Sequence, residues 1–142
     1  MAITQAICTS FKSDLLKGVD NFDSSGGNTF KIALYTSSAS LDSTTTAYTA
    51  TNEVTGTGYT AGGQALTNLG VTVSGTTAYI DFSDVTWTSS TISAAGALIY
   101  NSSASNKAVL VLSFGGTYSS TNGDFTIQFP APGASTAVLT LT

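Results

Sequence analysis

Residues 96–116, GALIYNSSASNKAVLVLSFGG, contain two apolar runs joined by a short polar connection. The second run, AVLVL at residues 108–112, is almost continuously apolar, which is typical of a strand buried on both faces. The connection at residues 101–106 is rich in serine and asparagine, which favour turns. This stretch therefore predicts two strands joined by a turn, with the AVLVL strand central in a sheet.

Strand patterns continue along the chain on both sides of this pair. In FKIALY, residues 30–35, Phe30, Ile32 and Leu34 occupy every second position, which predicts a half-buried strand. A turn is expected at Gly115–Gly123, and the prolines from Pro130 on end the preceding strand because proline cannot donate to a ladder. The other expected strands are Leu69–Val73, Ala78–Phe82, Val85–Thr88, Ala95–Tyr100, Ala108–Phe114, Phe125–Phe129 and Ala137–Leu141.

Short strands separated by turns of glycine, serine and asparagine indicate a mainly β protein. We expect one antiparallel β-sandwich or barrel over residues 1–142, because this length suits a single domain. The expected core contains Ile32, Leu34, Ile80, Phe82, Leu98, Val109, Val111, Phe125 and Ile127.

Two segments near the amino terminus depart from the strand pattern. Apolar residues recur every fourth position from Ile3 to Leu15, which predicts a helix over about residues 3–18. Thr9 or Ser10 could cap its start, and Gly18 lies where a helix commonly ends. Residues 36–66 form a long polar loop, and loops of this length tend to be either functional or disordered. We expect this loop to pack in part, and to be the first place for partner contacts.

The composition limits which partners the chain can bind. Charged residues make up 8% of the 142 residues, where about 25% is usual, while there are 25 threonines and 20 serines. The net charge is −4, and the basic residues are four lysines. Nucleic acids and anionic membranes bind through clustered basic residues, so neither is an expected partner.

Few residues are suited to catalysis. The sequence has no histidine, which removes the usual base of serine and cysteine catalysis and the commonest zinc ligand. Its single cysteine, Cys8, lies among apolar residues and is expected to be buried. We therefore expect no enzyme activity, no catalytic residue and no cofactor.

Carboxylates are the remaining source of acid–base chemistry or metal binding. Asp81 and Asp84 could act as a pair, but we interpret Asp81 as a solvent-facing strand residue and Asp84 as a turn residue. Asp14 lies near Asp20, Asn21 and Asp23, whose oxygens could bind calcium. Their spacing does not match a known calcium loop, so a turn at the helix end is favoured and no metal is expected.

Glycine pairs and aromatic residues allow two further interpretations. The stretches at residues 56–58 and 62–63 lack the Lys-Ser/Thr signature of a phosphate loop, so we interpret them as turns. Aromatic rings could form a sugar-stacking platform, but on alternating strands such rings more often lie in a core or an interface. The residues concerned are Tyr48, Tyr59, Tyr79, Tyr100, Tyr118 and Trp87.

Longer strings carry a resemblance to a known family. ITQAICTSFKSDLLKGVDNF at residues 3–22 and TFKIALYTSSASLDSTTTAYTATNEVTGTGYTAGG at residues 29–63 resemble small virion-associated proteins of tailed bacteriophages. The resemblance continues through residues 96–116 and through FTIQFP at 125–130. It implies a virion structural protein, and the family provides no catalytic or binding residues to carry across.

The resemblance leaves the place in the virion open. A capsid decoration (cement) subunit would bind the shell of the major capsid protein, commonly as a homotrimer. A tail- or fibre-associated protein would instead contact a host-surface glycan. The short chain without fibrous repeats favours decoration, with docking through the helix region and the 36–66 loop. A free carbohydrate-binding module is disfavoured, because no signal-peptide pattern opens the sequence; we expect synthesis in the host bacterial cytoplasm.

Overall fold

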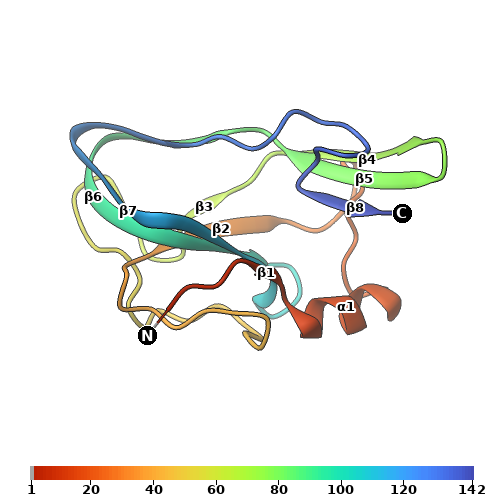
Figure 1. Ribbon diagram of the computed structural model, residues 1–142, viewed down its shortest axis with the longest axis horizontal. Coiled ribbons are helices and arrows are strands. Elements are labelled where there is room, and N and C mark those ends of the chain that lie inside the picture. The colour runs from red at the N-terminus through yellow and green to blue at the C-terminus, as the bar shows by residue number, and fades with distance from the viewer. Residues whose placement is uncertain (1) are drawn as a thin grey trace.

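The computed structural model describes residues 2–142 and has two antiparallel sheets packed as a sandwich beside one short helix (Figure 1). The five-stranded sheet has the order β1-β7-β6-β2-β3, and the three-stranded sheet has the order β4-β5-β8. The sandwich is therefore confirmed over the barrel. The elements are β1 (Ala6–Ile7), α1 (Thr9–Leu16), β2 (Phe30–Tyr35), β3 (Gln64–Ala65), β4 (Asn68–Ser74), β5 (Thr77–Phe82), β6 (Val85–Asn101), β7 (Lys107–Ile127) and β8 (Leu139–Leu141).

The strand pair predicted from residues 96–116 forms the middle of the five-stranded sheet. Strand β6 pairs with β7 from Val85↔Ile127 to Asn101↔Lys107, and its other edge pairs with β2. Residues 108–111 of the AVLVL run are all buried, as predicted. The nine residues of the expected core are likewise all buried, and they belong to one continuous apolar cluster.

Strands β6 and β7 are much longer than the sequence pattern predicts. Four expected strands are in fact two. The turn expected at Gly115–Gly123 is wrong because these residues lie within β7, and Tyr118, Ser119, Ser120 and Gly123 pair with β6. The β6–β7 pairing continues past residues that disfavour strands because its register shifts at several points, among them near Ser90 and Gly96. Such bulges bend a ribbon without ending its pairing. Figure 1 shows the β6–β7 ribbon curling over, so that one hairpin contributes to both layers.

The predicted helix is shortened at its amino-terminal end. Residues 3–8 are extended: Ala6 and Ile7 pair with β7, and the Thr4 N–H donates to the Leu41 carbonyl at 2.8 Å. Pairing with an existing strand edge outweighs the four-residue apolar spacing. Cys8 is the N-cap and makes no side-chain capping bond, so the predicted caps are wrong. The helix ends where expected, with Gly18 at φ 75°.

Strand β2 is buried at five of its six positions, so the prediction of a half-buried strand is wrong. Its second face is covered by residues 36–66, which include only the two-residue strand β3. In Figure 1 this segment, orange to yellow, runs mainly below the five-stranded sheet, opposite the curled part of the β6–β7 ribbon. Residues 36–66 therefore form a layer that covers this face of the five-stranded sheet, and they do not project away from it.

Candidate functional site

Glu53 holds the 36–66 segment against the sheet. Its side chain is 8% exposed and accepts three hydrogen bonds. One carboxylate oxygen accepts from the Tyr48 hydroxyl at 2.6 Å, and the other accepts from the Tyr59 hydroxyl at 3.0 Å and the Gly62 N–H at 2.6 Å. The Tyr59 oxygen in turn accepts from the Leu34 N–H of β2 at 2.9 Å. A carboxylate inside the loop thus ties both halves of the loop to a core strand.

Two further tyrosines complete this arrangement, which we call the Glu53 cluster: Glu53 with Tyr35, Tyr48, Tyr59 and Tyr100. The Tyr100 hydroxyl donates to the Gly62 carbonyl at 2.6 Å, and the Tyr100 ring stacks on that of Tyr48 with centroids 5.0 Å apart. The Tyr35 hydroxyl donates to the Thr49 carbonyl at 2.7 Å. Every phenol in the cluster therefore has a fixed hydrogen-bond acceptor.

The electrostatics of the cluster favour the neutral phenols. Burial, and then the negative charge of Glu53, raises the pKa of Tyr35 and of Tyr100 above its ordinary value. Burial is also the largest cause of the raised pKa of Tyr48 and of Tyr59. A phenol that resists ionisation remains a donor and is a poor base, so the cluster is suited to anchoring rather than proton transfer. Sequence reasoning missed Glu53, although it is the only glutamate in the chain and lies between two tyrosines of the loop.

Asp81 and Asp84 do not form a catalytic pair. Asp81 is 1% exposed, so its prediction as a solvent-facing residue is wrong, whereas Asp84 is exposed in the turn before β6 as predicted. The Asp81 carboxylate accepts from the Phe82 N–H at 2.8 Å, and its other oxygen has no partner. Asp84 accepts from the Phe129 N–H at 2.8 Å. Since both carboxylates of a glycosidase must reach the substrate, the burial of Asp81 removes this chemistry.

The acidic residues after α1 form the turn that the sequence favours. Asn21 accepts from the Asp23 N–H at 3.0 Å, and Asp23 accepts from the Ser25 N–H at 3.2 Å. Asp20 is buried and accepts from the Asn101 amide at 2.8 Å. These oxygens are thus used within the protein, and residues 2–142 contain no group of three or more metal-ligating side chains that could hold a metal ion.

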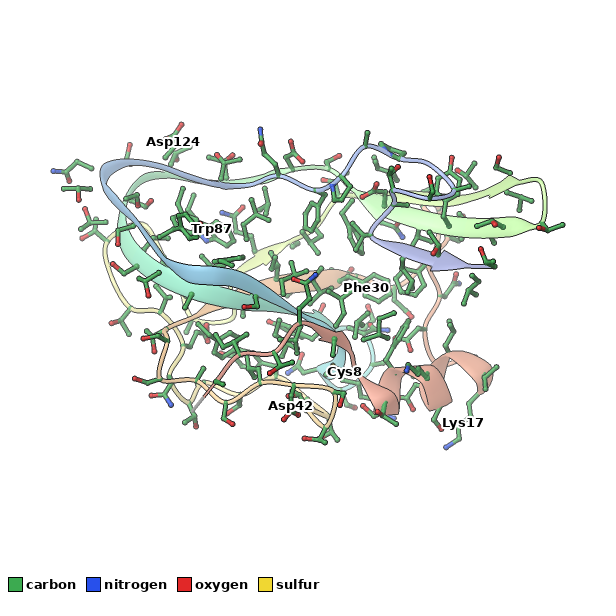
Figure 2. All side chains as sticks on the ribbon, in the orientation of Figure 1. Cys8, Lys17, Phe30, Asp42, Trp87 and Asp124 are labelled. Carbon is green, nitrogen blue, oxygen red and sulfur yellow. The ribbon has the colours of Figure 1, made fainter. Side chains whose placement is uncertain are left out.

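The aromatic residues do not form a common platform. Trp87 and Tyr100, on strand β6, are buried, as predicted for aromatics on strands. Tyr48 and Tyr59, in the 36–66 loop, also pack against the core. Figure 2 shows Trp87 pointing into the space between the layers, while Asp124 and Lys17 point outward. Tyr118 alone among the six is strongly exposed, at 58%.

Tyr118 lies in the wall of a groove of about 880 Å³ along β7. The groove lies between residues 112–119 and residues 124–130, and Ala137 and Val138 also line it. Phe114, Phe125 and Phe129 provide aromatic surface, and polar side chains such as Gln5 and Gln128 line it as well.

A second groove, of about 420 Å³, lies between the end of α1 and the three-stranded sheet. Its lining is mainly apolar, with Leu15 and Phe22 on one side and Val71, Ile80 and Leu139 on the other, and it includes Asp20 and Asn21 near the end of α1. It continues outward onto exposed apolar side chains of the sheet.

Cys8 is fully buried, which confirms its prediction as a small core residue. Burial, together with the nearby charge of Asp42, raises the pKa of its thiol to about 11, so the reactive thiolate is disfavoured.

Over residues 2–142, no helix has the length and apolar character to cross a membrane.

The chain matches no family model, no curated protein and no solved structure.

Proposed function

We propose that the chain is a virion structural protein of a tailed bacteriophage, and that it is a capsid decoration (cement) subunit. In this role it binds the shell of the major capsid protein as a homotrimer and stabilises that shell. The sequence resemblance over four segments supports this function. The structural observation that carries it is the fixed, hydroxyl-bearing outer surface of residues 36–66.

This surface is unusual for a long loop because hydrogen bonds of the inward-pointing Glu53 cluster fix its backbone. Glu53 is buried, and the only other charged residue of the segment is Asp42. A held surface loses little conformational freedom on binding, so modest contacts suffice for attachment. The exposed hydroxyl residues are Ser37, Ser38, Ser40, Thr44, Thr46, Thr51, Thr55, Thr57 and Thr60.

A shell offers the same binding site many times, and a trimer engages several sites at once. Linked sites raise the effective concentration, so weak individual contacts give firm attachment. Because the surface carries hydroxyls rather than charges, attachment should depend little on ionic strength.

The test begins with purified particles. A decoration subunit should approach the major capsid protein in copy number and should be retained at about 0.5 M salt, where charge interactions are strongly screened. Low copy number, or release in such salt, would contradict the proposal.

The docking surface itself is tested with purified chain added to shells that lack it. The double variant Thr51→Glu with Thr55→Glu places unpaired charges in the contact, which costs binding energy, so it should lose shell binding. Thr121→Glu changes an exposed threonine of β7 and serves as the control, which should bind normally. Equal binding by both variants would exclude residues 36–66 as the docking surface.

A second candidate function is a tail- or fibre-associated protein that contacts a host-surface glycan. The groove beside Tyr118 favours it, because an exposed aromatic ring next to amide and hydroxyl side chains suits a neutral sugar. Tyr118→Ala should then abolish glycan binding and particle adsorption, while Thr117→Ala should preserve both. Normal adsorption by the Tyr118 variant would remove this candidate.

A further inference from the structure

The three-stranded sheet has one apolar face that runs out of the core into solvent. Strand register places Val71 opposite Ile80 and Val73 opposite Ala78, and β8 continues the same rows. Directly paired residues of an antiparallel sheet lie on the same face. We call this surface the apolar sheet face: Val71, Val73, Ala78, Ile80, Leu139 and Leu141.

Exposure on this face is high on the edge strand β4 and at the outer end of β8, and low where β5 and β8 reach the core. Ile80 and Leu139 are 6% and 7% exposed, whereas Val71, Leu141 and Val73 are 55%, 57% and 70% exposed. The inner end joins the groove whose other wall includes Leu15 and Phe22. Figure 1 shows the sheet extending past the body of the sandwich, with α1 below it. The strands therefore continue to place apolar side chains on this face where no other part of the chain covers them.

The charge distribution indicates what covers the face. Residues 64–80 and 125–142 contain no charged side chain, although the whole chain has a net charge of −4. Two copies that meet through this part of the sheet therefore bring no acidic side chains of these residues together. A charged partner would find no opposite charge here, and its own charges would be buried unpaired. A second copy presents an equally apolar and uncharged face, so it satisfies both conditions.

The edges of the sheet add to this argument. Strand β4 is an edge strand of seven residues, and it carries no lysine or proline, the residues that commonly block edge pairing. Its register irregularity lies between Asn68 and Val71, so residues 71–74 beyond it are regularly paired with β5 and leave their other edge open. Leu69 on the same strand is also 47% exposed. An uncovered apolar face beside an open edge is an aggregation hazard unless a regular partner covers it.

We infer that the apolar sheet face packs against the same face of other copies of this chain and forms the self-association surface. The inference rests on the proposed function only for the number of copies, which we expect to be three; in that case the three faces converge on a threefold axis, and each face contacts both neighbours. Interface cores are depleted of charge and enriched in apolar side chains, which is the composition of this face. Residues 36–66 remain free for the shell, since they cover the other sheet.

The experiment uses the purified full chain alone, without shells. Its mass is measured by sedimentation or by light scattering from low micromolar to about 100 μM. Wild type should be an oligomer, and Val73→Asp should weaken association by about tenfold or more. Val73→Thr keeps the β-branched shape and guards against misfolding, and it should weaken association less. Thr72→Asp, the neighbour on the opposite face of β4, is the control and should associate like wild type.

A monomeric wild type at all concentrations, or a Val73→Asp variant that remains fully associated, would overturn the inference. So would equal weakening by Thr72→Asp, which would indicate a contact through the strand edge rather than the face. Shell docking is measured separately with the Thr51/Thr55 double variant, which should still associate. A failure of the self-association surface is therefore distinguishable from a failure of the decoration function.

Discussion

At the scale of single residues, Glu53 is the clearest polar anchor, because its carboxylate accepts three hydrogen bonds. Glu53→Ala would leave the buried Gly62 N–H and two partly buried phenols without their acceptor. Each unsatisfied buried group costs about 1–3 kcal/mol, so we expect a loss of at least about 3 kcal/mol in the free energy of unfolding. Glu53→Gln keeps one carbonyl acceptor and should lose less. Urea unfolding measures both, with Thr51→Ala as an exposed control from the same loop; equal stability of all three would contradict the anchor.

Asp81 is a residue that works against stability. Burial raises the pKa of its carboxyl above the ordinary 3.8, with the nearby Asp84 charge adding to the shift and the Phe82 N–H opposing it. A raised folded pKa gives stability that is fully present below the unfolded value and is lost as pH rises through the folded value. Asp81→Asn removes the ionisation, so its urea midpoint should exceed that of wild type at pH 7 and approach it near pH 3.5. An advantage that is the same at both pH values would show that charge is not the cause.

At the scale of elements, propensity and alternation predicted where strands occur but not where they end. Residues 115–123 contain three glycines and an asparagine, which favour a turn, yet they lie within β7, and residues 118–120 and 123 pair with β6 on either side of bulges. Whether such a segment turns or stays in a strand depends on the strand beside it, and the periodicity of one segment carries no information about that neighbour. The same holds for Ala6 and Ile7, whose helical spacing yields to the open edge of β7.

Gly63 is the position at which the long loop rejoins the sheet, and only glycine fits there. It has φ 76°, and a Cβ atom would overlap the Ile32 carbonyl. We predict that Gly63→Ala costs about 2–4 kcal/mol, from the left-handed backbone and the displaced strand together. Gly116→Ala, which has open space and ordinary φ, should be neutral or slightly stabilising. Thermal unfolding of both variants measures the difference, and a tolerated Gly63→Ala would mean that the contact yields easily.

At the scale of the whole molecule, stability comes from apolar packing and hydrogen bonds rather than charge. Among residues 2–142 one ion pair occurs, between Lys107 Nζ and Asp14 Oδ1 at 3.6 Å, and the lysine side chain is 43% exposed. We expect the urea midpoint to change little between about 0.05 and 0.5 M sodium chloride. Lys107→Met should cost less than about 1 kcal/mol. A steep fall of the urea midpoint with salt would contradict this prediction, because it would indicate ionic stabilisation beyond the single Lys107–Asp14 pair.

The surfaces were less predictable than the core. The nine expected core residues are all buried because alternation identifies inward positions directly. The loop at residues 36–66 was identified as a place of interest, but its anchor was not, because Glu53 acquires its role only from partners brought by folding. Val71 and Val73 were expected to be ordinary strand residues, and nothing in their local pattern distinguishes an exposed apolar face from a buried one.

The internal anchoring of the loop has an evolutionary consequence. The Glu53 cluster holds the backbone with side chains that point inward, while the exposed threonines and serines contribute no bond to that cluster. Mutational drift at the exposed positions can therefore alter what the surface recognises without unfolding the protein that carries it. Selection can match such a surface to a changing partner one hydroxyl at a time, and the scaffold is inherited intact.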